Sequence, residues 1–293
     1  MSGRTVVEFG PAWSAGFRRG TDVELRGWVQ TALGWCDETD AIALRHFRRD
    51  LDIERKPDRS FVTVVDTSIE LLIRDRIRAT FPKHGVVGEE YGADAGGASV
   101  RWYVDPIDAT HNFIRGVPVF ATLMAVERDG ELQAAVISAP ALGERWGAWR
   151  GGGAWAMSSR TPGDVRRMKV SRIDALEDAQ VLYSSVTDLE ASGLAPGFRQ
   201  LRAGAWRERG FGDFWGYTLL AEGAAEAMIE VDLKPWDAAA PFLLVEEAGG
   251  RVTDFAGDRS FAGGSFLATN GRLHDAVLAT ITATDEGGAE DGV

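Results

Sequence analysis

The chain has 293 residues, 45% of them hydrophobic, which is enough to bury a large core in one domain or in two closely packed halves. Its single cysteine, Cys36, excludes an intramolecular disulfide framework and a cysteine-based metal site. The formal net charge of −12 argues against a nucleic-acid partner, because phosphate backbones are bound by clustered Lys and Arg. With no apolar run long enough to span a membrane and no signal-peptide pattern, we expect a cytoplasmic protein with no membrane partner.

The first elements are predicted to be a helix and a strand. Apolar residues at helical spacing predict helix between residues 21 and 50, with breaks near Gly34 and Asp37. The β-branched residues of 60–65 predict a strand that ends at Asp66.

A second helix and two short strands are predicted next. Thr67 and Glu70 form a capping-box pattern, which predicts the start of a helix that runs to about Phe81. Short apolar runs at residues 86–87 and 102–104 predict strands, and each is followed by acidic residues.

The remaining elements are predicted to be mixed strands and helices. Residues 121–139 read as a hairpin with its turn at residues 129–130. A strand is predicted over residues 181–183, and helices are predicted over residues 214–229 and 238–248.

We divide the chain into four parts. An irregular extension (residues 1–20) precedes an N-terminal α+β half (residues 21–160) that carries the candidate metal and phosphate motifs. A C-terminal α/β half (residues 161–283) carries the last acidic motif and a candidate specificity segment, and a disordered acidic tail (residues 284–293) ends the chain.

Six acidic residues follow strand-like runs or open helices. They are Asp66, Glu89, Glu90, Asp105, Asp108 and Asp237. Acids at the carboxyl ends of strands are where ligands bind in α/β proteins, and oxygen-only ligation suits Mg²⁺ or Mn²⁺ better than zinc. Each acid also has an ordinary explanation, since Asp66, Asp108 and Asp237 could be helix N-caps and the two Glu residues solvated surface.

The strongest single motif lies between Asp105 and Thr110. Pro106 fixes one φ angle and can hold the carboxylates of Asp105 and Asp108 on the same side of a rigid turn. Ala109 and Thr110 would then begin a helix whose free N–H groups can bind an anion. The motif therefore predicts a cation site beside a phosphate site.

Four motifs resemble the signatures of the inositol monophosphatase-like superfamily. They are residues 62–66, 88–90, 105–113 and 236–240, the last with 247–250. The resemblance runs in order from about Asp22 to Ile281. It implies Mg²⁺-dependent hydrolysis of a small phosphorylated metabolite, an α/β fold in the form of a layered α/β/α/β/α sandwich, and a homodimer.

The resemblance also implies a set of metal ligands. Glu89, Asp105 and the carbonyl of Ile107 would hold a first ion, and Asp105, Asp108 and Asp237 a second. Two Mg²⁺ ions, or three, would occupy the site, with Mn²⁺ as the alternative metal. Such ions clamp the attacking and leaving oxygens and lower the pKa of bound water.

Catalytic and phosphate-binding roles are implied in the same way. Asp66 would pair with the hydroxyl of Thr110 and, with Glu89, help to activate a metal-bound water, while the N–H groups of Ala109 and Thr110 would bind phosphate oxygens. The superfamily normally has Gly where Ala109 stands. We expect Ala109 to be an ordinary first residue of a helix, where a methyl group is harmless; a positive φ would instead strain it.

Residues 207–223 resemble the histidinol-phosphatase branch of the superfamily. Histidinol phosphate carries an ammonium group and an imidazole, so its pocket gains from carboxylates, and Asp213 and Glu230 would supply them while Arg209 steers the phosphate. Asp213 could instead be an N-cap, and Arg209 could form a surface salt bridge. The implied substrate-binding residues are Glu89, Ile107, Asp108, Ala109, Thr110, Arg209, Asp213, Glu230 and Asp237.

Three functions are therefore considered. The first is a Mg²⁺-dependent phosphatase that converts histidinol phosphate to histidinol and phosphate in histidine biosynthesis. The second is another phosphatase of the superfamily, acting on inositol 1-phosphate or on a different sugar or nucleotide phosphate. The third belongs to a different class: a non-catalytic metal- or phosphate-binding module.

Overall fold

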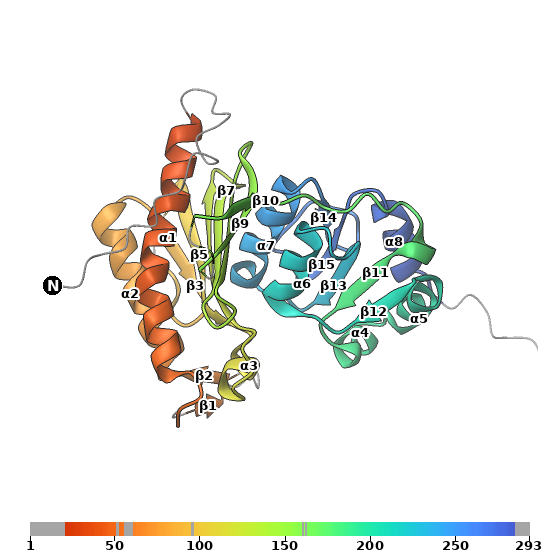
Figure 1. Cartoon of the computed structure of the whole chain (residues 1–293), viewed down its shortest axis with the longest axis horizontal. Helices are drawn as coiled ribbons and strands as arrows, with labels where there is room; N and C mark the ends of the chain where they lie inside the picture. Colours follow the sequence, from red (N-terminus) through yellow and green to blue (C-terminus); the bar gives the residue numbers. More distant parts are fainter. Residues whose placement is uncertain are drawn as a thin grey trace, which may run out of the picture.

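The computed structural model describes residues 21–50, 53–55, 61–94, 97–159, 161 and 163–284. The predicted extension (residues 1–20) and residues 285–293 of the predicted tail lie outside this range. The described chain forms five layers, with two sheets that alternate with three layers of helices (Figure 1). The predicted α/β/α/β/α sandwich is confirmed.

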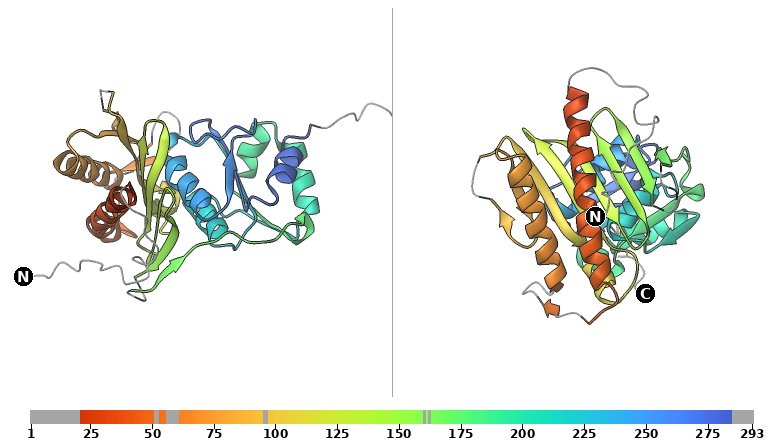
Figure 2. Two further views of the ribbon diagram at one scale, coloured as in Figure 1. Left: turned by 90° about the horizontal axis from the view of Figure 1, so that it is seen from above. Right: turned by 60° about the vertical axis from the view of Figure 1, so that its left-hand side comes forward.

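The first layer consists of two long helices, α1 (Thr21–His46) and α2 (Val64–Thr80), which lie on the outer face of the first sheet (Figure 2). The predicted breaks in α1 near Gly34 and Asp37 are wrong, because the helix is continuous. A Cβ atom at Gly34 would contact nothing, while Leu33 and Cys36 on either side are buried against the sheet. Tertiary packing therefore outweighs the weak helix preference of glycine.

Helix α2 starts earlier than predicted. Its N-cap is Thr63, the last residue of strand β2 (Phe61–Thr63), rather than a residue near Thr67. The Thr63 hydroxyl accepts a hydrogen bond from the Val65 N–H (3.1 Å), and the Asp66 carboxylate accepts one from the Thr63 N–H (2.8 Å). This capping box ends the strand three residues sooner than the β-branched pattern predicts.

The first sheet has eight strands in the order β10-β9-β8-β7-β6-β5-β3-β4, in which only β3 and β5 pair in parallel. Their bounds are β3 (Gly85–Gly88), β4 (Gly92–Ala93), β5 (Val100–Asp108), β6 (Ala121–Arg128), β7 (Glu131–Ala139), β8 (Glu144–Trp149), β9 (Gly153–Ser158) and β10 (Val165–Arg167). The predicted hairpin is confirmed as β6 and β7, and its turn has positive φ at Asp129 and Gly130 (53° and 87°). A separate short strand, β1 (Ile53–Arg55), pairs with β2.

The second sheet has five strands in the order β12-β11-β13-β15-β14. Their bounds are β11 (Gln180–Tyr183), β12 (Arg207–Arg209), β13 (Ala227–Val231), β14 (Arg251–Thr253) and β15 (Ser265–Thr269). Its outer face is covered by three helices, α4 (Val186–Ala191), α5 (Ala195–Gly204) and α8 (His274–Ile281) (Figure 1). A 3₁₀ turn (Leu176–Asp178) precedes β11.

Helices α6 (Asp213–Ala221) and α7 (Pro235–Glu247) form the middle layer. The predicted helix over residues 214–229 is wrong in its second half, because β13 begins at Ala227. Gly223 turns the chain there with a φ of +80°, and a Cβ at this position would lie 2.9 Å from the Lys169 carbonyl oxygen. Every residue from Ala238 to Val245 of α7 is buried, because this helix packs on both sheets.

The chain passes from the first sheet to the second after β10. Strand β10 therefore still belongs to the first sheet, although it lies beyond the proposed boundary at residue 160, and the division into two halves remains a prediction. No helix in the described ranges is both long and apolar enough to cross a membrane.

Candidate active site

Asp105 and Asp108 lie at the end of β5, where the register of the β5–β6 ladder shifts between them. The bulge is fixed from both sides: the Thr122 hydroxyl donates to the Pro106 carbonyl (2.8 Å), and the Ile107 N–H donates to the Asp105 carboxylate (3.0 Å). Both acids are removed from solvent, with exposed fractions of 2% and 9%. Bulges of this kind re-aim side chains at the end of a strand.

The carboxylate of Asp108 connects strand β5 of the first sheet to helix α6 of the middle layer. Its Oδ2 accepts a hydrogen bond from the Phe214 N–H (2.8 Å) in the first turn of α6. Gly212, the N-cap of α6, must be small because a Cβ there would lie 2.6 Å from the Ser184 Cα. Asp108 thus caps a helix 106 residues away and not the one that follows it, whose N-cap is Ala109.

Ala109 adopts a left-handed conformation (φ 63°, ψ 47°) before the short helix α3 (Thr110–Ile114). The expectation that it is an ordinary first helical residue is therefore wrong. The chain has to turn sharply from β5 into α3, and a left-handed residue provides that turn. For an L-residue with a Cβ this conformation costs roughly 1–2 kcal/mol.

Asp66 lies within reach of Thr110, but the two are not tightly paired. The Thr110 hydroxyl is 3.5 Å from the Asp66 carboxylate and donates a shorter bond, 2.9 Å, to the Ile107 carbonyl. Asp66 itself is buried and accepts from the N–H and hydroxyl of Thr63. The structure thus brings together two predicted catalytic residues and the predicted carbonyl ligand.

Glu89 follows β3 in a turn that a buried acid, Glu70, holds in place. The Glu70 carboxylate accepts from the N–H groups of Glu90 (2.6 Å) and Tyr91 (3.2 Å) and pairs with Arg74 (2.8 Å). A Cβ at Gly88 would collide with the Glu70 carboxylate, which explains the glycine before the two Glu residues. Sequence reasoning treated Glu70 only as part of a capping box; its spacing from Arg74, four residues on, was the available signal.

Asp237 lies in the first turn of α7, and Asp213 is the first residue of α6. The Asp237 carboxylate accepts from the Lys234 N–H (2.9 Å), so the helix starts at Pro235 and not at Ala238. Asp213 has a φ of +56° and follows the N-cap, so the alternative role as N-cap does not hold.

Burial and mutual repulsion raise the pKa values of these acids. Desolvation, reinforced by the charge of Glu89, raises the pKa of Asp66 to about 6 and that of Asp237 to about 7. The pKa of Asp105 is raised well above its usual value by burial and then by the charges of Glu89, Asp108 and Asp237. Burial and the charges of Asp213 and Asp237 do the same to the pKa of Asp108.

A divalent cation fits this donor set. None of Asp66, Asp105, Asp108 and Asp237 forms a salt bridge with a Lys or Arg in the part of the chain that the structure describes, so no ion pair offsets their repulsion. As the side chains stand, no three His, Cys, Asp or Glu residues among those described are arranged to hold one ion. One oxygen of each of Asp66, Asp105 and Asp237 accepts from a backbone amide, so an ion would bind the second oxygen of these carboxylates or require the side chains to rotate.

A cavity of about 580 Å³ opens beside Asp108, between α3 and the second sheet. Its acidic lining residues are Asp188, Asp213 and Glu230, and the Glu230 carboxylate accepts from the buried Tyr217 hydroxyl (2.8 Å). Burial and the charge of Asp213 raise the pKa of Glu230 to about 8. Asp188 was not predicted, because no motif marks it.

Arg209 is not brought to this cavity. It is exposed on strand β12, where its guanidinium donates to the neighbouring Glu208 carbonyl (2.6 Å), and it is absent from the cavity lining. Residues Gly210 to Gly212 line the cavity instead. The steering role assigned to Arg209 therefore has no support from its position.

The sequence model of the inositol monophosphatase family matches residues 24–286. The histidinol-phosphatase of Streptomyces coelicolor is 42% identical over 248 residues, which cover 83% of this chain and 92% of that protein. The histidinol-phosphatase of Mycobacterium tuberculosis is 42% identical over 256 residues, which cover 87% and 98%. The crystal structure of the extragenic suppressor protein suhB from Bartonella henselae superposes with a TM-score of 0.80 at 27% identity, covering 87% of this chain and 98% of that one.

The chain belongs to the inositol monophosphatase family. It is a phosphoric monoester hydrolase, as the family resemblance implied, and its resemblance to the histidinol-phosphatase branch is confirmed. The family consists of metal-dependent phosphatases that act on small phosphorylated substrates.

Proposed function

We propose that this protein is a Mg²⁺-dependent histidinol-phosphate phosphatase that acts in histidine biosynthesis in the cytoplasm. The observation that carries the proposal is the cavity beside Asp108, whose lining includes the three acids Asp188, Asp213 and Glu230. Histidinol phosphate presents an ammonium group and an imidazole, which form charge-assisted hydrogen bonds with carboxylates, whereas a polyol phosphate presents neutral hydroxyls. The relatives at 42% identity support the same substrate.

In this proposal the acids at the end of β5 and their neighbours hold the metal. Glu89, Asp105 and the Ile107 carbonyl would bind one ion, and Asp105, Asp108 and Asp237 a second. When bound, Mg²⁺ neutralises phosphate charge and lowers the pKa of water. The raised pKa values of Asp105, Asp108 and Asp237 fit this role, since they come from burial and from neighbouring negative charges, and a bound cation would offset both.

The remaining groups orient the reactants. Asp66 lies 3.5 Å from the Thr110 hydroxyl, so a small side-chain rotation would let Thr110 donate to Asp66 and turn its oxygen lone pairs toward the attacking water. The N–H groups of Ala109 and Thr110 would bind the phosphate oxygens as their charge redistributes. Glu70 fixes the turn that carries Glu89. A homodimer stays a prediction.

A substrate panel tests the proposal. Purified protein with Mg²⁺ is assayed on histidinol phosphate, inositol 1-phosphate, fructose 1,6-bisphosphate and a 3′-phosphonucleotide, and kcat/KM should be highest for histidinol phosphate. Faster turnover of another ester would refute the substrate. Asp108→Asn, which can still accept from the Phe214 N–H, should reduce kcat/KM by about 100-fold or more. An unchanged rate would instead favour the non-catalytic module.

Asp213→Asn tests the recognition of the substrate's cationic end. Asparagine tolerates the positive φ at this position, so the fold is kept while one charge is lost. We expect KM for histidinol phosphate to rise by about 10-fold, the value of one charge-assisted bond, while KM for p-nitrophenyl phosphate changes little. Asp129→Asn, at an exposed hairpin turn with a φ of +53°, is the matched control. Equal changes for both esters would leave Asp213 with a structural role.

A further inference from the structure

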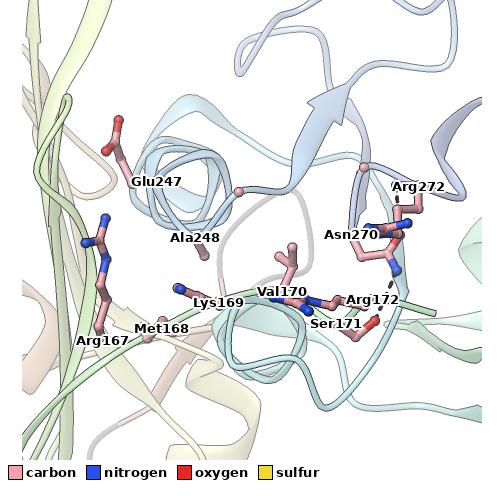
Figure 3. A pocket seen from close by; sticks show the side chains of 12 residues that line it. Arg167, Met168, Lys169, Val170, Ser171, Arg172, Glu247, Ala248, Asn270 and Arg272 are labelled. Atoms are coloured by element: carbon pink, nitrogen blue, oxygen red, sulfur yellow. Dashed lines mark hydrogen bonds between the residues drawn. The ribbon is translucent and has the colours of Figure 1, made fainter. Parts of the chain in front are cut away.

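A second cavity, of about 530 Å³, lies between the segment from Arg167 to Arg172 and two loops of the second half (Figure 3). The two loops follow helix α7 and strand β15, at residues 247–249 and 270–272. None of its lining residues belongs to the cavity beside Asp108. The cavity is therefore distinct from the active site, and the function proposed above does not account for it.

The lining of this cavity is basic. It contains four cationic side chains and one acidic one, in a chain whose net charge is −12. The cationic residues are Arg167, Lys169, Arg172 and Arg272, and the acidic one is Glu247. Glu247 is already engaged, since its carboxylate accepts from the N–H groups of Gly151 (3.0 Å) and Gly153 (2.9 Å). Its charge is thus directed to the turn between β8 and β9.

The cations have few partners of their own. Within the described ranges, Lys169 and Arg172 form no hydrogen bond or salt bridge through their side chains. Arg167 lies over the ring of Trp155 (5.7 Å), and Arg272 approaches the exposed Asp174 only to 3.6 Å. Like charges that share one hollow repel each other, so an anionic ligand would be stabilising there.

The end of helix α7 does not explain these cations. Helix C-termini attract cations through their unpaired carbonyls. Here, however, the carbonyls of Val245, Glu246 and Ala248 accept from the N–H groups of Gly250, Gly249 and Val170 (2.9–3.1 Å). The last carbonyls of α7 therefore have backbone partners, and the Lys169 side chain is not needed to cap this helix.

The walls of the cavity are tied together by a buried side chain. The Asn270 amide nitrogen donates to the Ser171 hydroxyl (3.0 Å) and the Ile173 carbonyl (2.7 Å), and its oxygen accepts from the N–H groups of Arg272 (3.1 Å) and Leu273. In Figure 3 the Asn270 side chain points from the loop that also carries Arg272 toward Ser171, in the segment from Arg167 to Arg172. The backbone segments that carry the basic residues of the two walls are therefore held together, while the basic side chains are exposed to solvent.

We infer that this cavity is a binding site for a small metabolite that carries two or more phosphate groups. Three Arg side chains suit phosphate, because the guanidinium group binds its oxygens in a bidentate manner. The cavity volume fits a compact ligand such as a nucleotide. A nucleic acid does not fit, because its long phosphate backbone would be repelled by the rest of an acidic protein.

The test is a titration of the full chain with ATP, pyrophosphate or citrate at constant ionic strength. EDTA is present throughout, so that the active site holds no divalent ion. Calorimetry should show saturable binding of ATP and pyrophosphate that is at least 10-fold tighter than that of citrate. The double variant Lys169→Ala/Arg172→Ala should weaken this binding by 10-fold or more, and Lys169→Gln alone by at least 3-fold.

The control is Lys83→Ala/Arg101→Ala, which removes the same charge from exposed positions at the start of β3 and β5. It should leave ATP binding within 2-fold of the parent chain. Equal weakening in both double variants would assign the effect to net charge and overturn the site. Citrate binding as tightly as pyrophosphate, or no saturable binding of any probe, would overturn it as well. Because no turnover is measured, these outcomes are independent of the proposed phosphatase activity.

Discussion

Ala109 stands where a left-handed residue is needed and glycine would be the usual choice. Its Cβ atom adds strain at the start of α3, beside the bulge that carries Asp105 and Asp108. Strain of this kind persists only where the surrounding structure fixes it. The Ile107 carbonyl, which accepts from Thr110, and the Ala109 carbonyl, which accepts from Asn112, provide that support on either side.

Replacing Ala109 with glycine should therefore stabilise the protein. Relief of about 1–2 kcal/mol of left-handed strain exceeds the roughly 0.4–1 kcal/mol lost to the greater freedom of unfolded glycine. Urea unfolding should show a gain of about 0.5–1 kcal/mol, with phosphatase activity retained. Ala276→Gly, on the exposed face of α8, is the control and should lose about 1 kcal/mol. If Ala109→Gly lowered the free energy of unfolding as much as Ala276→Gly does, Ala109 would not be strained.

At the scale of elements, the turn after β3 depends on helix α2. Glu70 is fully buried; it joins that helix to the Glu90 and Tyr91 amides, and it pairs with Arg74 of the same helix. Breaking a buried ion pair by removing one charge costs about 3–5 kcal/mol. Arg74 would keep a second partner, Asp94 (2.7 Å), so the cost here is expected at the lower end of that range. The position of Glu89, and with it the proposed first metal site, thus depends on a residue outside the acidic motifs.

We expect Glu70→Gln to lower the free energy of unfolding by about 3 kcal/mol and to weaken Mg²⁺ binding, because the Glu89 turn loosens. Gly88→Ala should weaken Mg²⁺ binding too, since its Cβ would displace the Glu70 carboxylate. Thermal unfolding and calorimetric titration with Mg²⁺ measure both effects. Gly27→Ala in α1, where a Cβ meets nothing, should leave Mg²⁺ binding unchanged. Normal Mg²⁺ affinity in Glu70→Gln would show that the turn that carries Glu89 keeps its conformation without the Glu70 carboxylate.

Elements with a strong local pattern could be predicted from the sequence. The β6–β7 hairpin follows from two apolar runs of strand length that are joined by a turn pair that accepts positive φ. Helix α6 was predicted too long because residues 222–229 are as apolar as a helix face, and only the sheet pairing of β13 decides their conformation. The breaks in α1 were predicted from Gly34 and Asp37 alone, whereas packing on the sheet decides.

The candidate site could be predicted as far as local motifs reach. The charge of Glu89 acts on Asp66, Asp105 and Asp237, and that of Asp237 acts on Asp105 and Asp108, so the motifs do lie near one another; their assignment as metal ligands stays a prediction. The bond from Asp108 to the Phe214 N–H joins residues far apart in the chain, so no local pattern encodes it. The positive φ of Ala109 was missed because alanine ordinarily indicates helix.

For the whole molecule, the acids of the site set how stability depends on pH. Raised pKa values, about 7 for Asp237 and about 8 for Glu230, mean that the folded state binds more protons than the unfolded one. Stability of the metal-free protein should therefore fall as pH rises from 6.5 to 8. Buried His274, whose pKa is lowered to about 4, is neutral in the folded state over this window and is mostly neutral in the unfolded one.

Added Mg²⁺ should reverse the trend. Because binding requires deprotonated carboxylates, the Mg²⁺-induced rise in Tm should grow from pH 6.5 to 8, by the equivalent of about 1–2 kcal/mol. Differential scanning fluorimetry with and without Mg²⁺ measures this. Asp237→Asn with Glu230→Gln should flatten the pH dependence of the metal-free protein. A Mg²⁺ effect that is constant over this range would contradict the coupling.

One carboxylate, that of Asp108, serves both sides of the junction between the sheets, since it rises from β5 and ends on the amide of α6. An ion that binds this oxygen would compete with the hydrogen bond from the Phe214 N–H. If Asp108 binds the proposed metal, binding would therefore also weaken the hydrogen bond that links β5 to α6. Chelation and reloading should change how the two sheets are seated on each other before either sheet begins to unfold.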